Sequence, residues 1–153
     1  MIDIQQALVN AAELLAPLSP SSRLDAELLL GHILGVTRTF LYAFPEKKLT
    51  ETQLTSYEKI ILQRCEGSPI AYLIGQREFW SHNLSVNHHT LIPRPETELL
   101  VELTLSLLPE DSTQCVLDLG TGSGAIALAL ATERPLWHLQ AFRKQMERRD
   151  FPG

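Results

Sequence analysis

The feature that most constrains the fold is a glycine-rich segment between a short apolar stretch and a run of small apolar residues. Residues 115–119 (Cys-Val-Leu-Asp-Leu) predict a short buried strand, and residues 125–131 (Ala-Ile-Ala-Leu-Ala-Leu-Ala) predict a helix. Between them, glycines at positions 120, 122 and 124 let the backbone turn sharply and approach a ligand closely. A strand, a glycine loop and a helix in this order form the opening unit of an open α/β nucleotide-binding sheet.

The spacing of the glycines and the residue before them favour one class of ligand. The free N–H groups at a helix start attract a carboxylate or another anion. The loop has the spacing GxGxG, whereas nicotinamide- and flavin-binding domains have GxGxxG. Asp118 precedes the first glycine and would repel a pyrophosphate. These features favour S-adenosylmethionine over a dinucleotide and argue against a nicotinamide-dependent oxidoreductase. A tight turn without any ligand is the simpler alternative.

The rest of the chain divides into regions of different pattern. Apolar residues at helical spacing predict four short helices, over residues 4–18, 22–34, 38–43 and 50–65. Residues 68–92 change character: Ile70, Tyr72 and Ile74, then Phe79, Leu84 and Val86, partly alternate and predict a β-hairpin that joins two domains. After the turn made by Pro93 and Pro95, a helix is expected over residues 96–108, with its apolar face formed by Leu99, Leu100, Leu103 and Leu107.

Composition narrows the class of protein. The 153 residues contain no apolar run of the roughly 18 to 20 residues that a membrane helix needs, and no signal peptide is visible. The cysteines, Cys65 and Cys115, are 50 residues apart without CxxC spacing, so neither a disulfide framework nor a cysteine-rich metal site is expected. A reducing cytoplasm is the expected location.

The charge is unevenly distributed along the chain. Residues 1–133 contain eight basic and 16 acidic side chains, a net charge of −8. Residues 134–153 contain five basic and two acidic side chains, a net charge of +3, and Arg143, Lys144, Arg148 and Arg149 resemble a nucleic-acid patch. We interpret these four as a solvated tail, because a chain with a net charge of −5 does not favour broad binding to a phosphate backbone.

Several segments, in a fixed order, resemble one known family. They are Asp-Ala-Glu-Leu-Leu-Leu (25–30), Gly-Ser-Pro-Ile-Ala-Tyr-Leu-Ile-Gly (67–75), Glu-Phe-Trp (78–80), Leu-Ile-Pro-Arg-Pro-Glu-Thr-Glu (91–98) and Val-Leu-Asp-Leu-Gly-Thr-Gly-Ser-Gly-Ala-Ile-Ala (116–127). Over about residues 1–134 the chain resembles the protein-glutamine methyltransferases of peptide chain release factors, the HemK/PrmC family.

The resemblance implies an α+β fold with several parts. They are a helical substrate-recognition domain (1–67), a β-hairpin linker (68–92), the first part of a Rossmann-like methyltransferase domain (93–134) and a divergent basic tail (135–153). It implies transfer of a methyl group from S-adenosyl-L-methionine to the glutamine of the Gly-Gly-Gln motif of release factors, in translation termination. By the same match, residues 93–98 would border the cofactor pocket. The methionine part would be held by Gly120, Thr121, Gly122, Ser123 and Gly124.

The family pattern is incomplete in this sequence. There is no Asn-Pro-Pro-Tyr segment, which in the family holds the substrate amide, so no catalytic residue is assigned and no metal is expected. Residues 135–153 contain no Val, Ile or Thr, so they are not expected to supply the second strand of the sheet. We therefore expect the resemblance to stop near Pro135, through a shifted reading frame or, alternatively, in a short natural variant. The C-terminal third should be poorly ordered or prone to associate, and the isolated chain inactive.

Individual side chains have simpler interpretations than a functional one. His88 and His89 are adjacent, so they point to opposite faces of an extended segment and favour a solvated loop over a metal pair. His32 and His82 have no ligand-like partners at metal spacing, and are expected to be ordinary surface or packing histidines.

Six further positions have more than one interpretation. Asp25 and Glu27 could contact a partner, but we interpret them as surface charges near a helix start. Phe79 and Trp80 could stack on an adenine or a partner, but we interpret them as core packing at the domain junction. Arg94 and Glu98 could pair with each other or lie at the edge of the pocket.

Two alternative functions remain open on the sequence. The helical region could act alone as a module that binds a release factor. The chain could also be a relative of nucleic-acid adenine methyltransferases, which share the cofactor loop. The acidic body and the segments before the loop argue against the second alternative.

Overall fold

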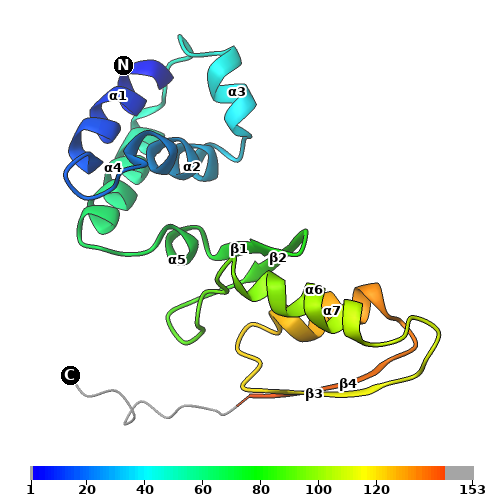
Figure 1. The fold of residues 1–153 in the computed structure, drawn as a ribbon. Helices are drawn as coiled ribbons and strands as arrows, with labels where there is room; N and C mark the ends of the chain where they lie inside the picture. Colours follow the sequence, from blue (N-terminus) through cyan, green and yellow to red (C-terminus); the bar gives the residue numbers. More distant parts are fainter. Residues whose placement is uncertain (1, 144–153) are drawn as a thin grey trace, which may run out of the picture. The chain divides into compact units, whose positions relative to one another are not determined.

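The computed structural model describes residues 2–143, and the chain divides into two compact units between Ile74 and Gly75. The N-terminal unit is helical (Figure 1). Its helices are α1 (Ile4–Leu15), α2 (Ser22–Leu34), α3 (Arg38–Ala43), α4 (Glu51–Cys65) and α5 (Ile70–Ile74). The prediction of four short helices before residue 66 is confirmed.

Lys144, Arg148 and Arg149 of the predicted basic tail lie outside the described residues.

Local signals set the ends of these helices. The Asp3 side chain accepts a hydrogen bond from the N–H of Gln6 at the start of α1. Thr50 and Gln53 form a reciprocal capping box at the start of α4, as their spacing indicates. Gly35 ends α2 in the left-handed conformation, with φ at 65°. Each end therefore has a partner for backbone groups that the helix itself cannot satisfy.

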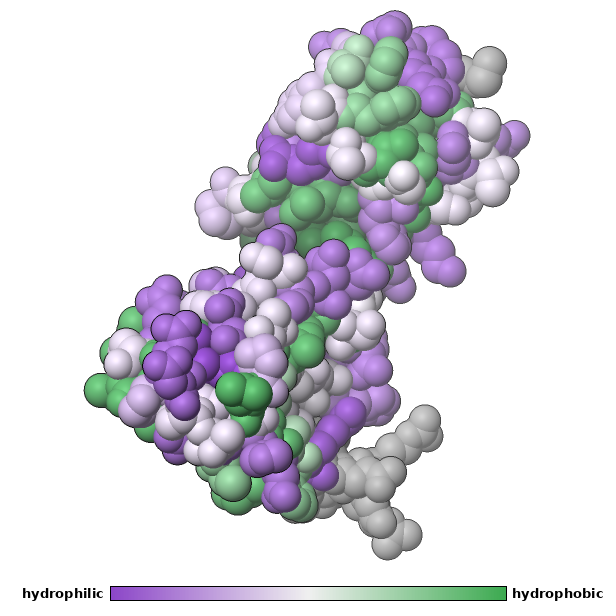
Figure 2. Space-filling model, turned by 90° about the vertical axis from the view of Figure 1, so that its right-hand side faces the viewer, coloured by the Kyte–Doolittle hydropathy of each residue, from purple (hydrophilic) through white to green (hydrophobic). Residues whose placement is uncertain are grey.

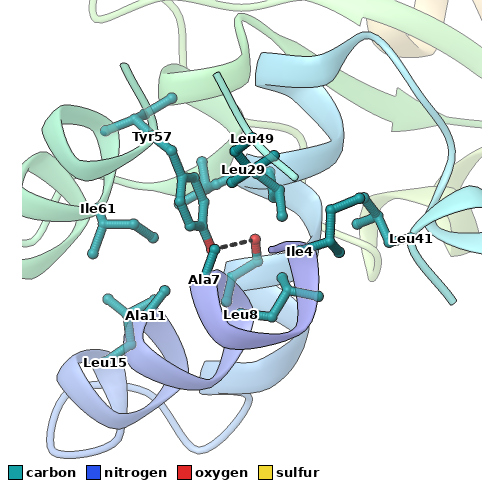
Figure 3. Close-up of a cluster of buried hydrophobic side chains, with 13 residues drawn as sticks. Ile4, Ala7, Leu8, Ala11, Leu15, Leu29, Leu41, Leu49, Tyr57 and Ile61 are labelled. Carbon is teal, nitrogen blue, oxygen red and sulfur yellow. Dashed lines mark hydrogen bonds between the residues drawn. The ribbon is translucent and has the colours of Figure 1, made fainter. Parts of the chain in front are cut away.

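The core of this unit is a cluster of aliphatic side chains around one tyrosine (Figure 3). Tyr57 of α4 is 2% exposed, and its hydroxyl donates a 3.0 Å hydrogen bond to the carbonyl oxygen of Ala26 in α2. Burial raises the pKa of this phenol well above its usual value. On the face drawn in Figure 2, apolar side chains gather over the middle of the unit, and hydrophilic ones border them.

The segment before the hairpin is helical rather than extended. Ile70, Tyr72 and Ile74 were expected to alternate along a strand, but residues 70–74 form α5. The side chains that pack on the core are Ile70, Leu73 and Ile74, which have the spacing i, i+3, i+4 of a helix. Pro69 precedes this turn, and its carbonyl oxygen accepts hydrogen bonds from the N–H groups of Tyr72 and Leu73. The apparent alternation was therefore a misleading signal.

The second unit combines a hairpin with a βαβ arrangement. β1 (Gln76–Phe79) pairs antiparallel with β2 (His82–Ser85), as predicted for this part of the linker. α6 (Thr97–Leu107), β3 (Cys115–Leu119), α7 (Ala125–Glu133) and β4 (His138–Phe142) follow. β3 and β4 are parallel, with Cys115 opposite His138 and Leu119 opposite Phe142. Figure 1 shows α6 and α7 on one side of this strand pair.

The strand β4 corrects the expectation that residues 135–153 supply no second strand. Its sequence, His-Leu-Gln-Ala-Phe, contains no β-branched residue. Trp137 just before it is 6% exposed and belongs to the same apolar cluster as Phe79, Val101 and Leu130, and Leu139 packs against that cluster. Packing and pairing with β3 thus outweigh the poor strand propensity of this segment.

Two expectations about burial are wrong in this unit. β3 was expected to be buried, but Leu117 and Leu119 are 54% and 73% exposed, because in the described residues helices cover only one side of the strand pair. The predicted apolar face of the helix over residues 96–108 is exposed as well. Instead, α6 packs through Val101 and Leu105.

Within residues 2–143 no helix is both long and apolar enough to span a membrane.

Candidate cofactor loop

The glycine loop lies between the end of β3 and the start of α7. Gly120, Gly122 and Gly124 have φ values of 78°, 58° and 82°. Side chains with a β-carbon rarely adopt these values, so the backbone itself requires glycine at all three positions. A β-carbon added at Gly120 or Gly124 would have no neighbour within 4 Å. The glycines therefore keep the loop open as well as bent.

Backbone hydrogen bonds close the loop against the end of β4. The N–H groups of Gly120 and Thr121 both donate to the carbonyl oxygen of Phe142, at 2.9 and 3.1 Å. Within the loop, the N–H of Gly124 donates to the carbonyl oxygen of Thr121 at 2.8 Å. β4, which was not expected from the sequence, thus helps to fix the glycine loop, which was expected.

Asp118 is held at the mouth of this loop. The hydroxyl of Thr121 donates a 2.7 Å hydrogen bond to Oδ2 of Asp118, and both residues are half-buried. Because a carboxylate has further lone pairs, the second oxygen of Asp118 keeps its acceptor capacity. A negative charge at this end of the strand disfavours a phosphate group, as the sequence indicated.

The start of α7 supplies the opposite polarity. Gly124 is the N-cap residue and has no side chain to cap the helix. The first N–H groups of α7 thus have no side-chain partner at the cap, at the positive end of the helix dipole. A loop with one carboxylate and a set of backbone donors suits a ligand that carries both a carboxylate and a cationic group.

In the segment expected to border the pocket, Glu98 contacts the hairpin. Glu98 does not pair with Arg94 in any described ion pair; its Oε1 accepts a 3.0 Å hydrogen bond from the backbone N–H of Trp80. Phe79 is 2% exposed and lies in the apolar cluster, so its predicted core role is confirmed. Trp80 is only partly buried, and it lies at the turn between β1 and β2.

The histidines do not form a metal site in the described part of the chain. No group of three or more potential ligand side chains of the His, Cys, Asp and Glu types is found in residues 2–143. Nε2 of His82 lies 3.1 Å from the hydroxyl of Thr132, and the backbone N–H of His89 donates to the side chain of Asn87. These contacts fit the predicted packing and loop roles.

Comparison with known proteins relates this geometry to a family. Residues 6–75 match the model of the PrmC N-terminal domain, a span that nearly coincides with the helical unit. The helical unit is thus similar to PrmC N-terminal domains. Beyond that domain, the similarity extends through the glycine loop to a set of curated methyltransferases.

The curated relatives are release factor glutamine methyltransferases from bacteria. The chain is 49% identical to that of Coxiella burnetii and 50% identical to that of Shewanella oneidensis, in each case over 92% of its own length. It is 56% identical to that of Escherichia coli over 76% of its length. The chain spans about half the length of these relatives, 51%, 49% and 42% respectively.

The extent of these matches bears on the C-terminal segment. A match over 92% of 153 residues leaves about 12 residues outside it, so it extends to about residue 141 or further. The similarity to the methyltransferases therefore continues past Pro135, where the sequence alone suggested that it would stop. It includes most of β4, in agreement with the pairing of β4 to β3.

Within residues 6–75, which match that family model, Glu27 forms a polar cluster that the sequence did not reveal. Glu27 was expected at the surface but is 1% exposed. Its Oε1 accepts a 2.9 Å hydrogen bond from Nε of Arg23, and its Oε2 accepts bonds from Arg38 and from the hydroxyl of Tyr42, each at 2.7 Å. Burial opposes ionisation, but the donors Tyr42, Arg38 and Arg23 together lower the pKa of Glu27.

Asp25 of the same helical unit is also buried, which again corrects the surface interpretation. It is 6% exposed and its Oδ2 accepts a 3.1 Å hydrogen bond from Nε of Arg64 in α4. The spacing of Arg23 and Glu27, four residues apart on one helix, was the only available sequence signal for these clusters. The partners Arg38 and Arg64 come from other helices, so they could not be found without the fold.

Proposed function

We propose that this chain provides the release-factor-binding and cofactor-binding portions of a release factor glutamine methyltransferase. The observation that carries the proposal is the set of three glycines with positive φ between β3 and α7. It is supported by the identity of 49–50% to such enzymes over 92% of this chain. The donor would be S-adenosyl-L-methionine and the acceptor the glutamine amide nitrogen in the Gly-Gly-Gln motif of a release factor. We assign this activity to the cytoplasm and to translation termination, by the same resemblance.

The residues of the loop fit this cofactor. Gly120, Thr121, Gly122, Ser123 and Gly124 would hold its methionine part. The uncapped start of α7 offers N–H donors for the methionine carboxylate, and the glycines leave open space above the backbone. Asp118 offers a carboxylate beside the loop for the cationic part. The bound cofactor supplies an electrophilic methyl group on a sulfonium centre.

We further propose that the 153-residue polypeptide does not turn over by itself. Methyl transfer relies on holding the acceptor nitrogen in line with the methyl carbon. The family segment that does this, Asn-Pro-Pro-Tyr, does not occur in the sequence, and no catalytic residue is assigned. Transfer of a labelled methyl group to purified release factor at an enzyme-like rate would overturn this part of the proposal.

Cofactor binding by the full chain tests the central proposal. Isothermal titration calorimetry should show binding of S-adenosylmethionine, competition by S-adenosylhomocysteine, and no binding of a nicotinamide dinucleotide. Gly122→Ala places a β-carbon at a φ of 58° and should weaken binding at least tenfold. The matched control is Gly35→Ala, which imposes the same strain at a φ of 65° in the helical unit and should leave binding unchanged. Binding of the dinucleotide, or of neither ligand by the unmodified chain, would contradict the proposal.

A second candidate function rests on the compactness of the helical unit. The match to the PrmC N-terminal domain, residues 6–75, has nearly the same limits as the unit Met1–Ile74. This unit alone would then bind a release factor, without any use of the cofactor loop. If so, the full chain should bind release factor equally well with Gly122→Ala and without any S-adenosylmethionine. Loss of binding in Gly122→Ala would argue against an independent module.

A further inference from the structure

A groove with an apolar lining runs between α1 and α4 of the helical unit. α1 presents Ala7 and Ala11, one helical turn apart and each 3% exposed, toward Tyr57 and Ile61 of α4 (Figure 3). A cavity of about 340 Å³ lies at this helix pair, and these four residues are part of its lining.

Large apolar side chains stand exposed along this groove. Leu14 of α1 is 60% exposed and Leu62 of α4 is 61% exposed, and both line it. Each leucine would gain free energy if a partner removed it from water. The groove therefore has an apolar floor and apolar walls, which is the anatomy of a docking surface for apolar side chains.

The charge at this groove has one sign. Among the described residues, Glu58 is the only charged one in the lining, and none of the described ion pairs includes it. α1 contains no lysine or arginine, and its one charged residue is Glu13. An occupant with a lysine or arginine beside its apolar side chains would complement this surface, whereas an acidic occupant would be repelled.

The polarity of the lining also selects the conformation of the occupant. Apart from Tyr57, whose hydroxyl is already bonded to Ala26, the polar side chains in the lining are Asn10 and Glu58. An extended peptide would lose water from backbone groups that this surface cannot pair. A helix satisfies its own backbone groups, and it presents apolar side chains at i, i+3 or i+4 and i+7 to such a groove.

We propose that the groove between α1 and α4 docks an amphipathic helix of the protein substrate, with aliphatic side chains against Leu14 and Leu62 and a basic side chain beside Glu58. This inference rests on the proposed function, which makes that substrate a peptide chain release factor. Beyond that function, the inference names the surface that binds the release factor and the kind of segment that this surface recognises. Recognition here is separate from the cofactor loop, which belongs to the other compact unit.

The test uses the full chain and a purified release factor, with the dissociation constant measured by titration calorimetry. Leu14→Ser and Leu62→Ser should each weaken binding about tenfold, because each removes an exposed wall of the groove. Glu58→Lys reverses the charge and should weaken it by a similar factor. The matched controls are Leu24→Ser, on an exposed leucine of α2, and Glu46→Lys, on an exposed glutamate between α3 and α4; both lie outside the groove and should leave binding unchanged.

The outcomes separate this inference from the function on which it depends. All altered side chains are exposed, so circular dichroism should show unchanged helix content and melting. If all five variants bind release factor as tightly as the unmodified chain, the groove is not the docking site, although the release factor remains the partner. If the unmodified chain binds S-adenosylmethionine but no release factor, the partner and the groove both fail while the cofactor assignment stands. If it self-associates and Leu14→Ser abolishes this, the occupant is a second copy and the inference is wrong.

Discussion

The indole N–H of Trp80 donates a 2.8 Å hydrogen bond to Oε1 of Glu133, the last residue of α7. The backbone N–H of the same tryptophan donates to Oε1 of Glu98, in the first turn of α6. The tip of the β1–β2 hairpin therefore contacts both helices of its unit. It does so with Trp80 at a φ of 49°, in the left-handed region that non-glycine residues rarely adopt.

Trp80→Phe should reduce the stability of this unit. Phenylalanine keeps an aromatic side chain but has no N–H for the hydrogen bond to Glu133, and because Glu133 is exposed it can be hydrated again. We expect a loss of about 1 kcal/mol in the free energy of unfolding. Urea denaturation followed by fluorescence of Trp137, the only other tryptophan, measures it. Glu133→Gln retains an acceptor oxygen and should cost less; an equal cost would show that the hydrogen bond is not the cause.

Ser81→Gly should stabilise the same hairpin. Ser81 has a φ of 62°, and with Trp80 it forms a two-residue connection with positive φ at both positions, as type I′ turns require. Glycine adopts this conformation without the penalty of a β-carbon, so we expect a gain of about 0.5 kcal/mol after the entropic cost of glycine. The comparison is Ser85→Gly in β2, which should lose stability in the same urea titration. A loss in both variants would refute the strain argument.

Glu27 should make the helical unit sensitive to acid. Its folded pKa is lowered below the ordinary 4.5, because the hydrogen bonds from Tyr42, Arg38 and Arg23 outweigh burial. The stabilisation by its charged form is thus fully present above pH 4.5 and is lost as the pH falls through the folded pKa. Glu27→Gln should cost about 2 kcal/mol at pH 7.

The pH dependence distinguishes this cluster from general acid denaturation. The difference between the unmodified chain and Glu27→Gln, measured by urea denaturation with far-ultraviolet circular dichroism, should shrink as the pH falls below 4.5. Glu46→Gln, on an exposed glutamate, should show no difference at any pH. A cost for Glu27→Gln that stays constant with pH would mean that the charge of Glu27 contributes nothing.

Gly31→Ala should destabilise the protein, against the usual trend for a glycine inside a helix. At most other helical positions, replacing glycine by alanine raises the free energy of unfolding by about 1 kcal/mol. Here the new β-carbon would lie 2.9 Å from the carbonyl oxygen of Val36, and the N–H of Val36 is bonded to the carbonyl oxygen of Gly31. The backbone after α2 must therefore shift, at a net cost of about 1 kcal/mol. Ser56→Ala, at an exposed position of α4, is the control and should be neutral or stabilising in thermal melts.

The parts of the fold that could be predicted from the sequence depend on local signals. The capping box of Thr50 and Gln53, the left-handed Gly35 and the three loop glycines each impose a conformation on their immediate neighbours. Their effect does not require knowledge of distant residues. The same applies to α7, whose small apolar residues predicted a helix that the structure confirms.

The parts that could not be predicted depend on partners far along the chain. Glu27 is buried because Arg38, 11 residues later, reaches it from α3, and Asp25 because Arg64 reaches it from α4. β4 forms because Trp137 and Leu139 pack with an apolar cluster whose other members lie elsewhere in the sequence. The strand propensities of single residues do not include such packing. For the candidate site, the sequence identified the loop residues but not the strand that closes them.

That closure has a consequence for how the motif behaves outside this fold. Two N–H groups of the loop depend on one carbonyl oxygen, that of Phe142, which lies 18 residues after the last glycine, Gly124. During synthesis, the Gly-Thr-Gly-Ser-Gly segment leaves the ribosome while that acceptor is still inside it. The loop can reach its final shape only when β4 has emerged and paired. Grafting the five residues into another scaffold would transfer the glycines but leave behind the acceptor that holds them in place.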